Sequence, residues 1–249
     1  MEQNRCTNCS GVTGNNFCSN CGQSVKTGRL NFHYLFHEFQ HTVLHADKGI
    51  IYTAKELFVN PDKIIRNYIE GKRVNIFKPF GFLIVLATIY GFLSHYLNIT
   101  YELDFSFVTG MTDNEMADIK SNYYNIYKVI YSHYSVFSLV SIFPLAFFSR
   151  FIFRKSGYNY IEHLVANAYI LGQQCLIYTL LIPLFYISSG NIYFDVATLL
   201  TFVYLVWVYV KLFAPYSSTA INILKALFVF GLYTLAIAIA GLIIGIFLY

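Results

Sequence analysis

The segment 223-ILKALFVFGLYTLAIAIAGLIIGIFLY-249 decides the fold class of this chain, because it holds a single charged residue, Lys225. An α-helix rises about 1.5 Å per residue, so about 20 apolar residues cross a hydrocarbon core of about 30 Å. In hydrocarbon, every backbone N–H and C=O group needs a partner within the protein, which leaves helices or closed barrels. Uninterrupted apolar residues without period-2 alternation exclude a barrel strand. The segment therefore predicts a transmembrane helix.

Four more apolar segments precede it, over residues 80–97, 129–149, 163–188 and 196–213. The chain of 249 residues is 56% hydrophobic and 12% charged, whereas soluble proteins contain about 25% charged residues. The sequence predicts an all-α polytopic membrane protein whose bundle of five transmembrane helices covers residues 80–249. The fourth segment is just long enough to cross the membrane. If it did not cross, the C-terminus would lie on the same side of the membrane as the N-terminus and not on the opposite side.

Basic residues predict the orientation of the chain. The first thirty residues lack the apolar core of a signal peptide, so the N-terminus is expected in the cytoplasm. Residues 1–79 hold ten Lys/Arg and six Asp/Glu, and the remainder holds seven of each. Lys and Arg favour the cytoplasmic side, and this topology places there Arg150, Arg154, Lys155, Lys211 and Lys225. The net charge of +4 is too small to indicate nucleic acid, and none is expected as a partner.

Four of the five cysteines follow the spacing C-x2-C-x8-C-x2-C, as Cys6, Cys9, Cys18 and Cys21. Two thiolate pairs at the tips of two turns suit tetrahedral zinc, and the positive φ angles of those turns are expected at Gly11, Gly14 and Gly22. We predict a zinc ribbon over residues 1–28, folded by the metal and structural, because four thiolates leave no open position for water. The alternatives are iron or another soft metal, and two disulfides in an oxidising compartment.

Four of the seven histidines recur at every fourth position, as His33, His37, His41 and His45. Aromatic and aliphatic residues beside them predict an amphipathic helix that lies on the membrane. Residues 37–41 also read H-E-x-x-H, in which His37 and His41 would bind zinc with Glu38 as general base, and His45 or Glu56 would be a third ligand. The helix has neither the sheet of soluble zincins nor the length of an intramembrane protease helix. The pattern therefore favours an interfacial histidine face that titrates near neutral pH.

Residues 29–79 are predicted to form a helical linker at the membrane surface. Asn60-Pro61-Asp62 is typical of a helix start, and Gly71 ends that helix. A basic cluster follows just before the first transmembrane segment, where each charge contributes about 1 kcal/mol of attraction to an anionic leaflet. We predict that this cluster contacts anionic lipid headgroups through Lys72, Arg73 and Lys78.

The same linker carries a resemblance to a known family. The residues that carry it are Asp47, Gly49, Thr53, Leu57, Pro61, Tyr68, Gly71-Lys72-Arg73 and Pro79. With the four-cysteine ribbon and the apolar helices, they resemble the bacterial membrane proteins of domain-of-unknown-function family 3667. In that family a glycine usually follows the proline, where this chain has Asp62, and the histidine stripe is not part of the pattern. The resemblance implies a multi-pass protein of the bacterial inner (cytoplasmic) membrane, and it implies no known activity.

The transmembrane segments contain few ionisable residues, which a transporter or channel ordinarily carries deep in the bilayer. Gln173 and Gln174 form a strongly polar pair near a helix centre, where they suit interhelical hydrogen bonds. Gly241 and Gly245 form a G-x-x-x-G face on the fifth helix, which would pack within the chain or against a second copy as a homo-oligomer.

No complete catalytic or permeation constellation is present in the sequence, which favours a non-enzymatic membrane scaffold. Its zinc ribbon would offer a contact surface to a cytoplasmic protein partner. One alternative is a transporter of a small solute or lipid, with a route along Gln173, Gln174, Pro144 and Pro183. The other is a zinc metallohydrolase that uses the H-E-x-x-H segment.

Overall fold

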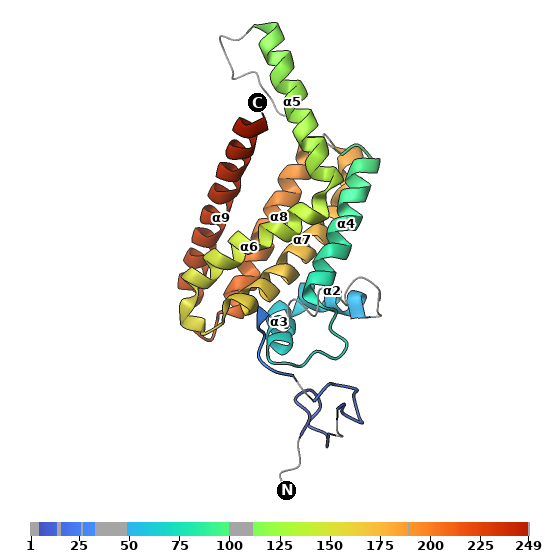
Figure 1. Cartoon of the computed structure of the whole chain (residues 1–249), viewed down its shortest axis with the longest axis vertical. Helices are drawn as coiled ribbons and strands as arrows, with labels where there is room; N and C mark the ends of the chain where they lie inside the picture. The colour runs from blue at the N-terminus through green and yellow to red at the C-terminus, as the bar shows by residue number, and fades with distance from the viewer. Residues whose placement is uncertain are drawn as a thin grey trace.

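The computed structural model describes residues 5–13, 16–25, 27–32, 49–99, 112–188 and 190–248. In these residues, five helices are long and apolar enough to cross a membrane, which confirms the predicted all-α membrane class. They are α4 (Pro79–Tyr96), α6 (Tyr134–Ile152), α7 (Tyr160–Ile187), α8 (Gly190–Leu212) and α9 (Thr219–Leu248). Figure 1 shows them in one bundle, with the cysteine-rich ribbon beyond one end and the end of α9 at the opposite end.

Helix α7 forms the centre of the bundle and contacts α4, α6 and α8. It begins with a capping box, in which Asn159 and Glu162 each accept the other's backbone N–H. Gly172 lets α4 approach closely, because a Cβ at this position would stand 2.6 Å from Cδ1 of Phe82. Helix α9 lies at the periphery, against α6 and α8. Among the described atoms, none lies within 4 Å of a Cβ placed on Gly241 of the G-x-x-x-G face.

A further helix, α5 (Asp113–Ser132), lies between the first two predicted transmembrane segments and includes the first residues of the second. It has a polar composition, and Figure 1 shows it projecting beyond the end of the bundle opposite the ribbon. The helix is interrupted at His133, and α6 begins at Tyr134, within the predicted apolar segment 129–149 and not at its start. Hydropathy alone could not separate the two helices, because the apolar run extends across the break.

The residues before α4 form two helices that pack across the ribbon end of the bundle, and we call residues 49–78 the belt (Figure 1). Helix α2 (Gly49–Val59) buries Leu57, and α3 (Pro61–Ile69) buries Ile65 and Tyr68. Pro61 occupies the first turn of α3, as predicted for a helix start, although the Asn60 side chain makes no capping hydrogen bond. After α3, Gly71 takes a φ of +90°, which ends the helix.

Side chains from the bundle fix the belt in place. The Gln173 amide donates to the carbonyl of Ala54 at 3.0 Å, and the Tyr204 hydroxyl donates to that of Leu57 at 3.1 Å. In the opposite direction, Nη2 of Arg66 donates to the carbonyls of Lys211 and Leu212, both at 2.8 Å. These carbonyls close α8 and have no partner within the helix. The belt is therefore joined to the bundle by hydrogen bonds in both directions, and its predicted place at the membrane surface stays a prediction.

Candidate metal centre and its attachment to the bundle

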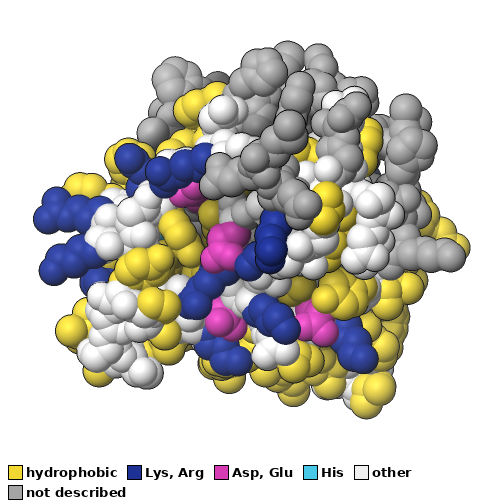
Figure 2. Space-filling view, turned by 90° about the horizontal axis from the view of Figure 1, so that it is seen from below, with side chains coloured by type: hydrophobic (Ala, Val, Ile, Leu, Met, Phe, Trp, Pro, Cys, Tyr) yellow, Lys and Arg dark blue, Asp and Glu magenta, His cyan; other side chains and the backbone are white. Residues whose placement is uncertain are grey.

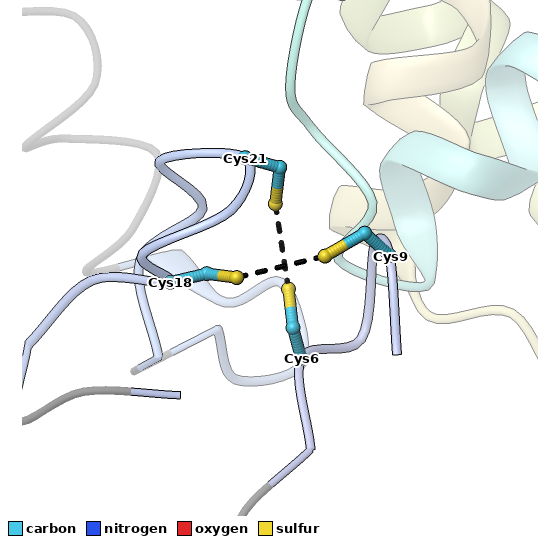
Figure 3. Close-up of side chains that lie close together, drawn as sticks. All are labelled: Cys6, Cys9, Cys18 and Cys21. Atoms are coloured by element: carbon cyan, nitrogen blue, oxygen red, sulfur yellow. Dashed lines mark hydrogen bonds between the residues drawn. The ribbon is translucent and has the colours of Figure 1, made fainter. Parts of the chain in front are cut away.

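The four cysteines of the ribbon converge on one point, as Figure 3 shows. All four Sγ atoms lie within 4.8 Å of one another. The sulfur atoms of Cys6 and Cys21 lie 3.6 Å apart, and those of Cys9 and Cys18 lie 3.5 Å apart. Each pair joins one C-x2-C turn to the other, so both turns are needed to form the cluster.

The backbone repeats the same turn at both cysteine pairs. The N–H of Cys6 donates to the carbonyl of Gly11, and the N–H of Cys18 donates to that of Gln23, at 2.9 and 2.8 Å. The carbonyls of Cys6 and Cys18 accept from Ser10 and Gly22, both at 2.9 Å. Two similar turns therefore present two similar pairs of thiols.

The positive φ angles of these turns fall at Ser10, with φ of 60°, and at Gly22, with φ of 72°. The prediction was correct for Gly22 and wrong for Gly11, while Gly14 lies outside the described residues. Gly11 is needed for another reason, because a Cβ there would stand 3.3 Å from Sγ of Cys9.

Backbone N–H groups favour the thiolate form of two cysteines. The N–H of Cys9 lowers the pKa of Cys6, and the N–H of Gly11, with the Asn20 side chain, lowers the pKa of Cys9 to about 6. At Cys21 the N–H of Gln23 lowers the pKa, but burial and the adjacent thiols raise it, so that it reaches about 11. Four thiols this close repel one another once ionised, and a bound cation removes that repulsion.

The distances fit a metal ion and not a pair of disulfides. A metal bound to four sulfurs at about 2.3 Å, as in zinc sites, holds them about 3.8 Å apart in a regular tetrahedron. A disulfide would bring two sulfurs to about 2.05 Å, and all five cysteines of the chain are free thiols. The cluster of Cys6, Cys9, Cys18 and Cys21 could therefore hold a metal ion. The fifth cysteine, Cys175, is buried in α7.

The ribbon is attached to the bundle through Arg29. Its Nε and Nη2 donate to the two carboxylate oxygens of Glu162, at 2.7 and 3.0 Å, and Nη2 also donates to the carbonyl of Gly157 at 2.8 Å. The hydrogen bonds to Glu162, followed by its charge, raise the pKa of Arg29. Next to it, Leu30 is buried and its carbonyl accepts from the Asn159 side chain at 2.9 Å. The chain that leaves the ribbon is thus fixed to the start of α7.

A second attachment joins the ribbon to the belt. The buried Gln23 side chain accepts from the N–H of Arg73 at 3.1 Å. Thr27 lies against Gly71, where a Cβ would stand 3.2 Å from Cβ of Thr27. Two contacts with different parts of the bundle end restrict the ribbon's orientation more than one contact would.

The three residues predicted to contact lipid are placed differently from one another. Lys72 pairs with Glu70 at 2.9 Å. Arg73 donates to the carbonyls of Tyr68 and Gly28, at 3.1 and 3.5 Å, and lies over the Tyr68 ring. Lys78 stands at the N-cap of α4. Arg73 therefore takes part in the attachment of the ribbon, and lipid contact by all three residues stays a prediction.

The two glutamines of α7 make the interhelical hydrogen bonds that suit them. Gln173 is fully buried and donates to the belt, whereas Gln174 donates to the carbonyl of Thr201 in α8 at 2.9 Å. Beside Gln174 lies a cavity of about 200 Å³ between α6, α7, α8 and α9. Besides apolar side chains, its lining residues include seven that carry a hydroxyl group, which are Tyr134, Ser138, Ser141, Tyr178, Thr198, Thr201 and Tyr233. The cavity reaches Gln174 but not Gln173.

A buried polar network joins three helices at the ribbon end of the bundle, and no sequence pattern had indicated it. The Ser149 hydroxyl lies 3.0 Å from Nδ1 of His163 and accepts from Asn167 at 3.1 Å. The Tyr209 hydroxyl donates to Asn167 at 2.6 Å. All four side chains are buried, so the network holds helices together and is closed to a soluble substrate.

The histidine stripe lies outside the described residues. His33, His37, His41, His45 and Glu38 all fall in the segment 33–48, so the H-E-x-x-H interpretation stays a prediction. Among the residues that the structure does describe, the cysteine cluster is the group that could hold a metal.

The belt residues that carry the resemblance have structural roles. Thr53 accepts the N–H of Phe77 at 2.8 Å. A Cβ on Gly49 would stand 3.0 Å from the carbonyl oxygen of Asn75. Pro61 and Pro79 begin α3 and α4. These residues hold the belt in shape and expose no reactive group.

Comparison with known proteins gives one match. The model of a family described as Protein of unknown function (DUF3667) matches residues 47–91, which cover the belt and most of α4. Searches of curated proteins and of solved structures give no match. Residues 47–91 are thus similar to the family of proteins of unknown function DUF3667, the family that the sequence resembles in this segment.

Proposed function

We propose that the protein is a membrane-anchored scaffold that holds a zinc ribbon in a fixed orientation on the cytoplasmic side of a bacterial inner membrane. The observation that carries the proposal is the double attachment of the ribbon, through Arg29 to Glu162 and through Gln23 to Arg73. A ribbon that served only to stabilise the chain would not need an orientation fixed by two contacts with the bundle.

Charge supports the cytoplasmic orientation. The ribbon end of the bundle carries the basic residues that lie after α6 and around the turn between α8 and α9, which are Arg154, Lys155, Lys211 and Lys225. Figure 2 shows Lys and Arg side chains spread over this end with few acidic ones among them. Basic residues favour the cytoplasmic side of a membrane. A reducing cytoplasm would also keep the four cysteines as thiols that can bind zinc.

The ribbon exposes two apolar side chains that suit contact with a protein. Val12 is 59% exposed and Phe17 is 64% exposed. Both lie in the backbone bridges that frame the cysteine cluster, Arg5 with Val12 and Phe17 with Ser24. Exposed aromatic residues on a rigid frame are typical centres of protein interfaces. The expected partner is a cytoplasmic protein that contacts Val12 and Phe17.

Site-specific photo-crosslinking in cells tests this function. We expect a photoreactive residue at Phe17 to form an adduct with a distinct protein, and one at Tyr216, exposed at the same end of the bundle, to form none. Cys18→Ser should abolish the Phe17 adduct because the ribbon loses its metal. Arg29→Ala should lower its yield several-fold while the metal content stays unchanged, because the ribbon remains folded but loses its fixed orientation. Adducts with lipid alone, or an equal yield in the Cys18→Ser protein, would contradict the proposal.

The cavity at Gln174 favours a second candidate function, the passage of a small neutral solute. Hydroxyl and amide groups line the cavity, and no Asp, Glu, Lys, Arg or His is among its lining residues. Such a lining can hydrogen-bond a polar molecule but gives no compensation for a charge in the membrane. The expected solute is therefore uncharged and small enough for about 200 Å³.

Glycerol uptake by vesicles that contain the purified protein measures this activity. Wild-type vesicles should equilibrate several-fold faster than protein-free vesicles, and Ser138→Phe, which fills the cavity, should return the rate to that of the lipid. Val136→Phe changes an exposed position of the same helix and should leave the rate unchanged. A wild-type rate equal to that of protein-free vesicles would end the transport interpretation for this class of solute.

A further inference from the structure

A pocket lies where α6 ends, on the same side of the bundle as the ribbon. Its volume is about 240 Å³, and it is lined by Phe147, Arg150, Phe151, Arg154, Tyr158 and Tyr160. The first three residues come from the last turns of α6, and the others come from the turn into α7 and its first residue. Two guanidinium groups and four aromatic rings thus share one opening.

The two arginines have no partner among the described residues. Arg150 and Arg154 are exposed, and neither side chain makes a hydrogen bond or an ion pair with the described residues. The nearby acidic group, Glu162, is already held by Arg29. The dipole of a helix favours cations at its C-terminal end. This preference explains why basic residues stand at the end of α6, but it does not explain why two of them line a pocket. The two charges are therefore available to an anion.

The other half of the pocket is apolar and continues into the face that α6 turns toward lipid. Phe147 is 59% exposed and Phe151 is 65% exposed. Val136, Val140 and Phe143 are exposed further along the same helix. Figure 2 shows basic side chains beside hydrophobic ones at the edge of the ribbon end. The pocket therefore lies at the boundary between the charged end and the lipid-facing surface.

We propose that this pocket binds an anionic phospholipid. The phosphate lies between Arg150 and Arg154, whose planar guanidinium groups can each donate two hydrogen bonds to it. The acyl chains run along Phe147 and Phe151, and Tyr158 and Tyr160 lie at headgroup level, where tyrosine is enriched. Basic pockets of this kind at the cytoplasmic ends of transmembrane helices recognise anionic headgroups. The site differs from the predicted contacts at Lys72 and Arg73, whose charged groups have partners within the chain.

Native mass spectrometry of the full-length protein in a neutral detergent tests the site, with defined lipids added in turn. We expect wild type to bind phosphatidylglycerol at least about tenfold more tightly than the double variant Arg150→Gln/Arg154→Gln, since two charge contacts are lost. Phosphatidylcholine should bind more weakly to wild type, because its choline group neutralises the phosphate, and diacylglycerol, which lacks the phosphate, should bind weakest. Lys155→Gln removes an exposed neighbouring charge outside the pocket and should leave phosphatidylglycerol binding unchanged.

Two further measurements distinguish a bound lipid from a misfolded variant and from a soluble anion. Arg150→Lys/Arg154→Lys keeps the charge, so it should retain part of the affinity and show that the loss in the glutamine variant does not come from misfolding. Inorganic phosphate should not displace phosphatidylglycerol, because it cannot occupy the apolar half of the pocket. Equal lipid affinity in the wild-type and glutamine proteins would overturn the proposal. Displacement by inorganic phosphate would also overturn it, in favour of a soluble anion.

Discussion

A Cys18→Ser variant is expected to lose the zinc ion that we propose for the ribbon, with bound zinc falling from about one ion per chain to background. Cys18 is buried, and its sulfur lies 3.5 Å from that of Cys9. A serine hydroxyl cannot replace a thiolate as a soft ligand. Because metal binding and folding are coupled in such a small unit, the loss removes roughly 10 kcal/mol of folding free energy from the ribbon.

The rest of the ribbon cannot compensate for that loss. Among the described residues of the ribbon, the backbone pairs through three isolated bridges, and Val12 and Phe17 are exposed. Hydrogen exchange at residues 5–25 should therefore rise to nearly unprotected rates in Cys18→Ser. Exchange in α4, α6 and α7 should stay unchanged, because their packing does not depend on the ribbon.

The matched control is Cys175→Ser, which removes the remaining cysteine, buried in α7. Elemental analysis of protein purified under reducing conditions should find the wild-type zinc content in this variant. Iron in place of zinc would correct the identity of the metal. Retention of zinc by Cys18→Ser would contradict the four-cysteine site. Alkylation of the wild-type protein after denaturation and metal removal should find five reactive thiols, and a smaller number would also contradict the site.

Local spacing was enough to predict the cysteine cluster. Two C-x2-C pairs separated by eight residues bring four sulfurs together whatever the rest of the chain does. The conformation of the turns was harder to predict, because φ is positive at Ser10, where glycine was not required. Glycine is needed at position 11 because a Cβ there would crowd the Cys9 sulfur. That contact follows from the three-dimensional structure and not from a conformational preference of the residue.

Hydropathy likewise predicted the five long helices, since length and composition are properties of each segment alone. It could not predict what joins them. The Arg29–Glu162 pair connects residues 133 positions apart, and Tyr204 reaches Leu57 across 147 positions. The capping box at Asn159 and Glu162 has a recognisable spacing, and it was the one available signal for that end of α7. Long-range partners of this kind depend on the packing of helices that the sequence does not specify locally.

The contact of Gly172 with α4 is also a long-range contact that local sequence does not specify, and a substitution there is expected to have a large effect on stability. A Gly172→Ala substitution is expected to destabilise the bundle by about 1–3 kcal/mol, as overpacking of a filled interior does. The new Cβ would stand 2.6 Å from Cδ1 of Phe82 and 3.2 Å from Cα of Leu83, so both a ring and a backbone atom of α4 must move. For a chain of this size, each kcal/mol corresponds to about 2–4 °C in melting temperature.

Thermal unfolding in detergent, followed by the near-UV signal of the tyrosines, measures this loss. The matched control is Gly231→Ala in α9, where a Cβ meets nothing within 4 Å among the described atoms. That substitution should leave the melting temperature unchanged or raise it slightly, because alanine favours a helix over glycine by about 0.5–1 kcal/mol. An equal loss at both positions would show that the substitution acts on helix formation in general and not on the contact between α4 and α7.

A double-mutant cycle then identifies which atom of α4 resists the new methyl group. Phe82→Leu removes the ring atoms that lie closest to Gly172 and leaves the backbone of Leu83 in place. If the ring is the obstacle, Gly172→Ala should cost markedly less in the Phe82→Leu background, and the two substitutions will be non-additive. If Gly172→Ala costs as much stability in the Phe82→Leu background, the obstacle is the backbone of α4. The helix cannot move away, because the belt, which continues directly into α4 at Pro79, also holds it. Either result supports a close approach of α4 and α7 at Gly172. If Gly172→Ala costs no stability in either background, that close approach is refuted.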